Sequence, residues 1–264
     1  MKIGFIGLGN MAKAMIGGML QKGIVEAGDI AGSAKTRNTL ERTGREFGIL
    51  TLDSNKDVAK WADVIVLAVK PVFLSEVIGE IRDEVTEEKL VISIAAGKSI
   101  KWIEKEFGKS LKLIRCMPNT PALVGAGCTA VCSNPAAGEK EEELCLRLME
   151  SFGKAIVIPE RLMDTAGAVG GSSPAFVFLF IEAMADGAVR EGMPRKQAYE
   201  FAANAVAGSA KLVLETGMHP GELKDMVCSP GGTTIEGMAA LEEKGMRSAV
   251  MEAIHACVEK SRQM

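Results

Sequence analysis

Two glycine-rich segments of the chain carry residue types whose spacing could support chemistry. Near the N-terminus, a short apolar run ends at Gly7-x-Gly9-x-x-Ala12 and leads into a helix-like stretch. Gly7 permits a tight turn, Gly9 lets the backbone approach a pyrophosphate, and Ala12 is small enough for the helix to pack against the strand. The free N–H groups and the dipole of the helix favour an anion. The segment therefore predicts a dinucleotide-binding turn, with a strand-turn-helix that binds no ligand as the alternative.

The second segment, Ser229-Pro230-Gly231-Gly232-Thr233-Thr234, opens a helix in the C-terminal part of the chain. Such a start leaves backbone N–H groups unpaired, with hydroxyl groups beside them, and binds a carboxylate well. Thr233 and Glu236 have the spacing of a capping box, so a capped helix start without a ligand is the alternative.

The end of the second predicted strand indicates which dinucleotide the first segment would bind. NAD-specific sites usually have Asp or Glu there to hold the ribose hydroxyls. Residues Ile30–Arg37 contain no acid, and Ser33, Lys35 and Arg37 form a cationic loop that suits a 2'-phosphate. We therefore predict a preference for NADP(H), with NAD(H) as a second cofactor that the site could accept. Ordinary surface cations at a solvated helix start are the alternative.

Strand-like and helix-like segments alternate over the first 158 residues. The predicted strands are Ile3–Ile6, Asp29–Ser33, Ile49–Leu52, Val64–Val69, Leu90–Ile94, Lys112–Cys116, Gly127–Cys132 and Ala155–Ile158. The predicted helices are Met11–Lys22, Thr36–Phe47, Val58–Trp61, Val72–Val85, Ile100–Phe107 and Glu139–Phe152. The alternation predicts an α/β fold, an N-terminal Rossmann-type doubly wound and mainly parallel sheet with its ligand at the carboxyl ends of the strands.

Small residues and prolines gather where three further predicted strands end. These segments are Ala68-Val69-Lys70-Pro71, Ala95-Ala96-Gly97 and Met117-Pro118-Asn119-Thr120-Pro121. Each could be an ordinary loop, but all of them lie with the Gly7 turn on one rim of the predicted sheet. We expect the cofactor at this rim.

Strand patterns vanish after Pro159, and Ala-, Met- and Leu-rich helical stretches follow. The predicted helices are Leu162–Val169, Pro174–Glu191 with a cap at Ser172-Ser173, Arg195–Thr216, Gly221–Val227, and Thr234–Gln263 with a break near Gly245. We predict a dinucleotide-binding domain over residues 1–159 and an all-helical domain over residues 160–264. Because Ala175–Ala185 and Ala202–Ala210 are apolar on all sides, we expect the helical domains of a homo-oligomer to pack together.

Composition excludes several classes of protein. The 264-residue chain has a net charge of -3 and no broad basic surface, so we expect no nucleic acid partner. The apolar run Pro174–Ala185 is interrupted by Glu182, and we expect no membrane partner. A strand begins near residue 2 without a secretory signal, which predicts a cytoplasmic protein. The six cysteines form no C-x-x-C pair and the two histidines have no ligand-like spacing, so we predict no metal site.

Taken together, the segments resemble those of the pyrroline-5-carboxylate reductase family, which catalyses the last step of proline biosynthesis. The turn at residues 7–12, the three strand ends, Gly170–Ala175 and Leu223–Gly237 follow the order of the family, and the last segment is similar to its signature. The resemblance covers the whole chain. It implies a helical dimerisation domain, dimers that assemble into larger rings, and pyrroline-5-carboxylate and proline as substrate and product.

The resemblance also implies which residues form the sites. The dinucleotide would contact Gly7, Leu8, Gly9, Asn10, Met11, Ala12, Ser33, Asn55, Ala68, Val69, Lys70, Pro71, Ala95, Ala96 and Gly97. To these we add Ile6 and the two cations Lys35 and Arg37 predicted from the second strand end. The substrate would contact Val227, Ser229, Gly231, Gly232, Thr233 and Thr234. Met226 departs from the pattern, since some relatives have a polar residue there.

The implied reaction transfers a hydride from nicotinamide C4 to the imine carbon of a five-membered ring. A protonated imine is already electrophilic, so the enzyme mainly supplies proximity and orientation. We predict that Thr234 is the catalytic residue and that its hydroxyl forms a hydrogen bond with the ring nitrogen.

Other functions of the same two-domain plan remain alternatives. A dehydrogenase for a β-hydroxy acid would need a lysine in the helical domain, and Gly170–Ala183 contains none. A related imine reductase is a second alternative. A non-catalytic NADP-binding protein is a third, which the intact segment from Ser229 to Thr234 disfavours.

Overall fold

The computed structural model describes residues 1–263, which form two compact units. The sheet unit comprises residues 1–172 with the C-terminal residues from 257, and the helical unit comprises Ser173–Ala256. The domain division predicted between residues 159 and 160 stays a prediction, and in the structure residues 160–172 pack with the sheet.

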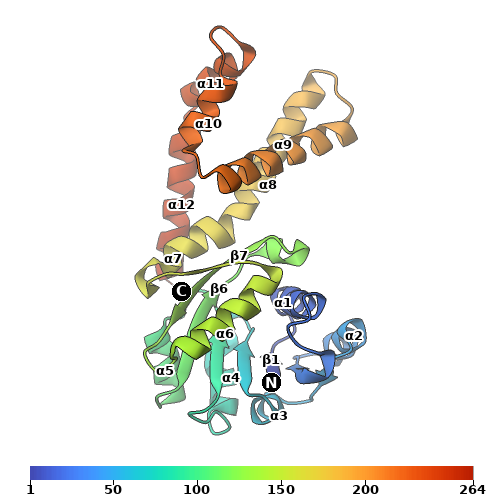
Figure 1. The fold of residues 1–264 in the computed structure, drawn as a ribbon, viewed down its shortest axis with the longest axis vertical. Coiled ribbons are helices and arrows are strands. Elements are labelled where there is room, and N and C mark those ends of the chain that lie inside the picture. The colour runs from blue at the N-terminus through green and yellow to red at the C-terminus, as the bar shows by residue number, and fades with distance from the viewer. Residues whose placement is uncertain (264) are drawn as a thin grey trace. The chain divides into compact units, whose positions relative to one another are not determined.

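The sheet unit contains one eight-stranded sheet with the order β3-β2-β1-β4-β5-β6-β7-β8. Figure 1 labels β1, β6 and β7 of this sheet. Neighbouring strands are parallel except for β6 and β7, which are antiparallel. The strands are β1 Ile3–Ile6, β2 Ile30–Ser33, β3 Leu50–Thr51, β4 Val64–Leu67, β5 Leu90–Ser93, β6 Lys112–Met117, β7 Gly127–Ser133 and β8 Gly153–Val157. Every predicted strand forms within two residues of its predicted ends, and the predicted fold class is confirmed.

Helices cover both faces of this sheet, which is why its central strands are unbroken apolar runs. All residues of β1, β2, β4 and β5 are buried. One core lies between the sheet and helices α1, α2 and α6, and the other lies between the sheet and α3, α4 and α5. These helices are α1 Asn10–Gln21, α2 Arg37–Phe47, α3 Asn55–Trp61, α4 Leu74–Ile81, α5 Ile100–Phe107 and α6 Glu139–Met149.

The helix predicted over Val72–Val85 is shorter than expected. It begins as a 3-10 turn at Pro71–Phe73, continues as α4, and has ended before Val85. The pattern was misleading because Val85 is itself buried in the core, although it lies in a loop after the helix.

The chain leaves the sheet through a continuous helical segment, Glu160–Arg190. It contains a short helix α7, Met163–Ala166, a π-helix at Gly167–Ser172, and α8, Ser173–Arg190. The predicted cap at Ser172-Ser173 is therefore wrong, because the π-helix runs into α8 without a break. This segment is long and apolar enough to cross a membrane by length and composition alone, and most of its apolar part is not buried in the single chain. The expectation of no membrane partner stays a prediction.

The helical unit packs chiefly through small residues. Helix α8 packs against α9, and the buried apolar residues of this unit within the described chain are Ala185 of α8 with Ala198 and Ala202 of α9. Its other helices are α9 Arg195–Thr216, α10 Pro220–Val227, α11 Thr233–Glu243 and α12 Met246–Arg262. The last turns of α12 belong to the sheet unit, where Ser261 Oγ donates to Asp164 Oδ1 at 2.9 Å.

Candidate functional site

The turn after β1 has the geometry that a dinucleotide pyrophosphate needs. Gly7 has a φ of +97°, and a Cβ atom at this position would lie 2.7 Å from the Ala68 carbonyl oxygen. Gly7 N donates to Ser33 O at 3.1 Å, which joins the turn to the end of β2. At Gly9 a Cβ atom would meet nothing within 4 Å, and no side chain caps α1 there. The first amides of α1 therefore border open space, as an anion site requires.

Beside this turn lies a cleft of about 510 Å³ that gathers segments far apart in the sequence. It is lined by Gly7, Ser33, Ala34, Lys35, Asp53, Ser54, Asn55, Val69, Phe73, Glu76, Val77 and Glu80. Five of the residues predicted for the cofactor line the cleft, namely Gly7, Ser33, Lys35, Asn55 and Val69. The sequence patterns thus converge at the carboxyl ends of β1, β2 and β4.

The other predicted cofactor residues do not line this cleft. Ile6, Leu8, Ala12 and Ala95 are buried in the core, so only their backbones could contact a ligand. Gly97 has a φ of +70° in the loop after β5. The remaining predicted positions, at the start of α1 and after β4 and β5, are Gly9, Asn10, Met11, Ala68, Lys70, Pro71, Ala96 and Gly97.

Three polar side chains form a hydrogen-bonded chain in the cleft. Ser33 Oγ donates to Asn55 Oδ1 at 2.6 Å, and Asn55 Nδ2 donates to Glu80 Oε2 at 2.7 Å. Ser33 ends β2, Asn55 begins α3, and Glu80 lies in the last turn of α4. The chain therefore connects the second strand end to helices on one face of the sheet.

The two predicted cations differ in their surroundings. Lys35 lines the cleft, with its Nζ atom 5.0 Å from the centre of the Phe73 ring. Arg37 is exposed and bound to two acids, Glu41 Oε1 at 2.9 Å and Asp53 Oδ1 at 3.5 Å. The hydrogen bond to Glu41 and the charge of Asp53 raise the pKa of the Arg37 guanidinium. A 2'-phosphate would have to replace these carboxylates as the partner of Arg37.

Three acids that line the cleft were not predicted from the sequence. Asp53 follows β3, and Glu76 and Glu80 lie one turn apart on α4. Their spacing of four residues on a helix was visible, but nothing in the sequence showed that this helix face lies beside the second strand end.

A further feature of the sheet unit connects the loop after β6 to the π-helix. Asn119 is buried, its Oδ1 atom accepts from Cys128 N at 2.8 Å, and its Nδ2 atom donates to Gly170 O at 2.9 Å. A Cβ atom at Gly171 would lie 3.1 Å from Met117 Cε. The glycines of the π-helix thus permit its close approach to this loop, and π-helices are often found at functional sites.

In the helical unit, the segment predicted for the substrate is an open helix start. Gly232 N donates to Ser229 O at 3.0 Å, and Gly231 has a φ of +66°. Gly232 is the N-cap of α11 and no side chain caps the helix, so the predicted capping box of Thr233 and Glu236 is wrong. Thr233 is instead the first residue of the helix.

The absent cap leaves this helix start available to a ligand. Ser229, Thr233 and Thr234 are all exposed beside it, as is Val227 at the end of α10. The first amides of α11 and these hydroxyls form a set of donors suited to a carboxylate.

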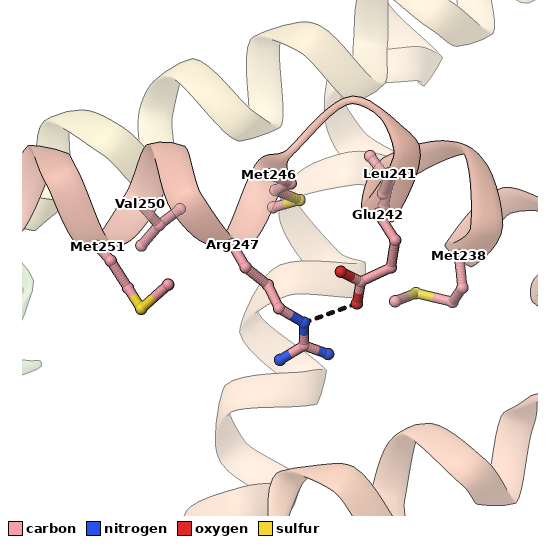
Figure 2. Close-up of a pocket in the computed structure, with 7 residues that line it drawn as sticks. All are labelled: Met238, Leu241, Glu242, Met246, Arg247, Val250 and Met251. Atoms are coloured by element: carbon pink, nitrogen blue, oxygen red, sulfur yellow. Dashed lines mark hydrogen bonds and ion pairs between the residues drawn. The ribbon is translucent and has the colours of Figure 1, made fainter.

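The helical unit also has an apolar hollow of about 410 Å³ where α11 meets α12 (Figure 2). Met238, Leu241, Met246, Val250 and Met251 line it, and Arg247 Nε donates to Glu242 Oε1 at 2.6 Å at its edge. A second apolar groove of about 650 Å³ lies between α8 and α12. Both hollows lack the polar groups of a dinucleotide site.

No group of three or more potential metal ligands occurs among residues 1–263. The free cysteines include a buried pair, Cys116 and Cys145, whose Sγ atoms are 3.5 Å apart. The hydrogen bond between these thiols is the larger cause, and burial the second, that raises the pKa of the Cys116 thiol.

The glycine turn, the cleft beside it and the helical C-terminal unit define a two-part dinucleotide-dependent oxidoreductase. Residues 2–97 match the family model described as NADP oxidoreductase, coenzyme F420-dependent, and residues 160–264 match the model described as pyrroline-5-carboxylate reductase dimerisation.

Whole-chain comparisons identify the family. The pyrroline-5-carboxylate reductase of Escherichia coli is 51% identical over 263 residues, covering 100% of this chain and 98% of that protein. The structure of a pyrroline-5-carboxylate reductase from Coxiella burnetii has a TM-score of 0.92 at 33% identity, covering 99% of this chain and 97% of the other. The structure of Plasmodium falciparum pyrroline carboxylate reductase with NADP bound has a TM-score of 0.89 at 33% identity and the same coverages. The chain belongs to the pyrroline-5-carboxylate reductase family.

Proposed function

We propose that the chain reduces 1-pyrroline-5-carboxylate to L-proline with NADPH, the last step of proline biosynthesis. The observation that carries this function is the 51% identity to a pyrroline-5-carboxylate reductase over the full length of both chains. The dinucleotide cleft and the uncapped start of α11 supply the two kinds of binding group that the reaction needs.

The geometry of the sheet unit fits a dinucleotide. The space beside Gly9 admits the close approach of a pyrophosphate to the first amides of α1. Ser33, Lys35 and Asn55 line the adjacent cleft. Ser33 and Asn55 would hold the adenosine ribose, and Lys35 would hold its 2'-phosphate. The strand ends at Ala68–Pro71 and Ala95–Gly97 would border the nicotinamide half. When bound, the nicotinamide supplies the hydride.

The start of α11 would hold the substrate. We assign the ring carboxylate to the first amides of the helix, with Ser229, Gly231, Gly232 and Thr233 around it. The Thr234 hydroxyl would accept a hydrogen bond from the protonated ring nitrogen and so fix the imine carbon in position. Orientation of this kind is the main contribution a protein makes to hydride transfer. No acid from the loop is needed, because the imine is protonated before it reacts.

The assembly follows from the helical region. Its match to a dimerisation model and its exposed apolar helices support a homo-oligomer, and we propose a dimer or a larger ring of dimers. A cytoplasmic location and the absence of nucleic acid and membrane partners stay predictions.

One assay tests the function. In one set of reactions, purified protein is mixed with NADPH and either pyrroline-5-carboxylate or a larger cyclic imine. In a second set, it is mixed with NADP⁺ and a β-hydroxy acid. The absorbance of the reduced nicotinamide is followed in both. Oxidation of NADPH with pyrroline-5-carboxylate, and formation of proline, is the expected result. Turnover of hydroxy acids alone, or of no substrate, would contradict the proposal.

A further inference from the structure

The hydrogen-bonded chain of Ser33, Asn55 and Glu80 fixes the direction of each hydrogen bond within it. A carboxylate only accepts hydrogen bonds, so Glu80 Oε2, 2.7 Å from Asn55 Nδ2, requires the amide nitrogen of Asn55 to face it. The amide oxygen of Asn55 then faces Ser33, 2.6 Å from its Oγ atom. Because that oxygen only accepts, Ser33 must donate its single hydroxyl proton to Asn55.

This direction decides what Ser33 offers to a ligand. With its proton directed at Asn55, the hydroxyl presents only lone pairs to the cleft that it lines. A ribose 2'-hydroxyl can donate to these lone pairs. A 2'-phosphate oxygen cannot, since it accepts hydrogen bonds only, and it would have to break the bond between Ser33 and Asn55.

Resting on the proposed use of this cleft for a dinucleotide, we propose that Glu80 is a specificity-determining residue that limits the preference for NADPH over NADH. Glu80 acts through Asn55. Its effect on the cofactor preference is opposite to that of Lys35, whose charge favours the 2'-phosphate. Without Glu80, the Asn55 amide turns, its nitrogen donates to Ser33 Oγ, and the Ser33 hydroxyl becomes a donor to the 2'-phosphate.

The neighbouring Glu76 offers a matched control. Glu76 and Glu80 lie one turn apart on α4, line the same cleft and are both exposed, but only Glu80 is bonded to Asn55. Substitution of each by Met removes one negative charge and keeps the length of the side chain. The difference between the two variants therefore separates the orientation of Asn55 from the loss of charge.

The experiment measures the Kd of NADPH and of NADH by the fluorescence of the reduced nicotinamide, without pyrroline-5-carboxylate. We expect Glu80→Met to shift the ratio of the two Kd values toward NADPH by about tenfold to a hundredfold, the effect of a hydrogen bond to a charged group. Glu76→Met should shift it by less than about threefold. In an Asn55→Ala background, Glu80→Met should have no more effect than Glu76→Met.

Equal shifts in the two Met variants, or an unchanged ratio in Glu80→Met, would overturn the role of Glu80. The expected shift in a protein that does not turn over pyrroline-5-carboxylate would support that role while contradicting the proposed reaction. Failure of the unaltered chain to bind either dinucleotide would overturn both.

Discussion

At the scale of single residues, the hydroxyl at the start of α11 carries the most direct chemical prediction. Thr234 is exposed beside amides that no side chain caps, so its hydroxyl is free to orient a ring nitrogen. Thr234→Ala should lower kcat with pyrroline-5-carboxylate by about tenfold to a thousandfold, the usual loss for one positioned polar contact. Thr234→Ser, which keeps the hydroxyl, should retain most of the activity. Wild-type turnover in the alanine variant would contradict the role.

The cations after β2 carry a second prediction at this scale. Substituting Lys35 and Arg37 together by Gln should raise the KM for NADPH about tenfold or more and leave that for NADH nearly unchanged, because charge-assisted hydrogen bonds to the 2'-phosphate are lost. Steady-state kinetics with both cofactors measures the effect. Arg45→Gln is the control, since Arg45 and Arg37 both pair with Glu41, but Arg37 also pairs with Asp53, which lines the cleft. Unchanged discrimination in the double variant would remove the phosphate-binding role.

At the scale of elements, the turn between β1 and α1 depends on two glycines for different reasons. A side chain at Gly7 would both adopt an unfavourable φ and collide with the Ala68 carbonyl, whereas one at Gly9 would enter open space. We therefore expect Gly7→Ala to lower the Tm of the ligand-free protein, and Gly9→Ala to leave the Tm nearly unchanged while weakening NADPH binding. Thermal denaturation and cofactor titration check both. If both substitutions lowered the Tm of the ligand-free protein equally, the separate roles of Gly7 in the fold and of Gly9 in cofactor binding would be contradicted.

The connection of β6 to the helices after the sheet gives another prediction. Arg115 is buried, with Glu160 at 3.3 Å and Asp164 at 3.7 Å, and Asp164 also accepts from Ser261. Arg115→Met should lower the free energy of unfolding by about 2 to 3 kcal/mol, because it leaves two partly buried carboxylates without their cation. Ser261→Ala should cost about 1 kcal/mol or less. Urea denaturation measures both, and equal losses would contradict the role of Arg115.

How far the sequence predicts these elements depends on the range of the interactions that form them. The strands follow from unbroken apolar runs such as Val64–Leu67, and the glycine turn follows from local backbone demands. The cap expected at Ser172 does not form, because the π-helix Gly167–Ser172 continues directly into α8. Likewise, the contact of Ser33 with Asn55 and Glu80 depends on three segments brought together only by folding, so no local pattern could predict it.

At the scale of the whole molecule, the helical unit of a single copy exposes large apolar side chains to water. Its fully buried apolar side chains are small alanines, while Phe178 and Leu179 of α8, Phe201 of α9 and Met251 of α12 are each more than 60% exposed. Apolar area of this extent marks a protein interface. Because the same residues belong to the region that matches the dimerisation model, we attribute the apolar length of Glu160–Arg190 to contacts between copies of this chain.

The exposed apolar face makes the assembly itself testable. Phe178→Glu with Leu214→Glu places charges on α8 and α9 at positions 62% and 84% exposed in the single chain. If a second copy covers this face, each charge would be buried without a partner, and the assembly should dissociate to smaller species at micromolar concentration. Size-exclusion chromatography with light scattering measures the mass. Val124→Asp is the control, since Val124 is 81% exposed on the sheet unit. A double variant with the mass of the unaltered protein would show that this face is not the interface, whereas dissociation caused equally by Val124→Asp would place the interface elsewhere.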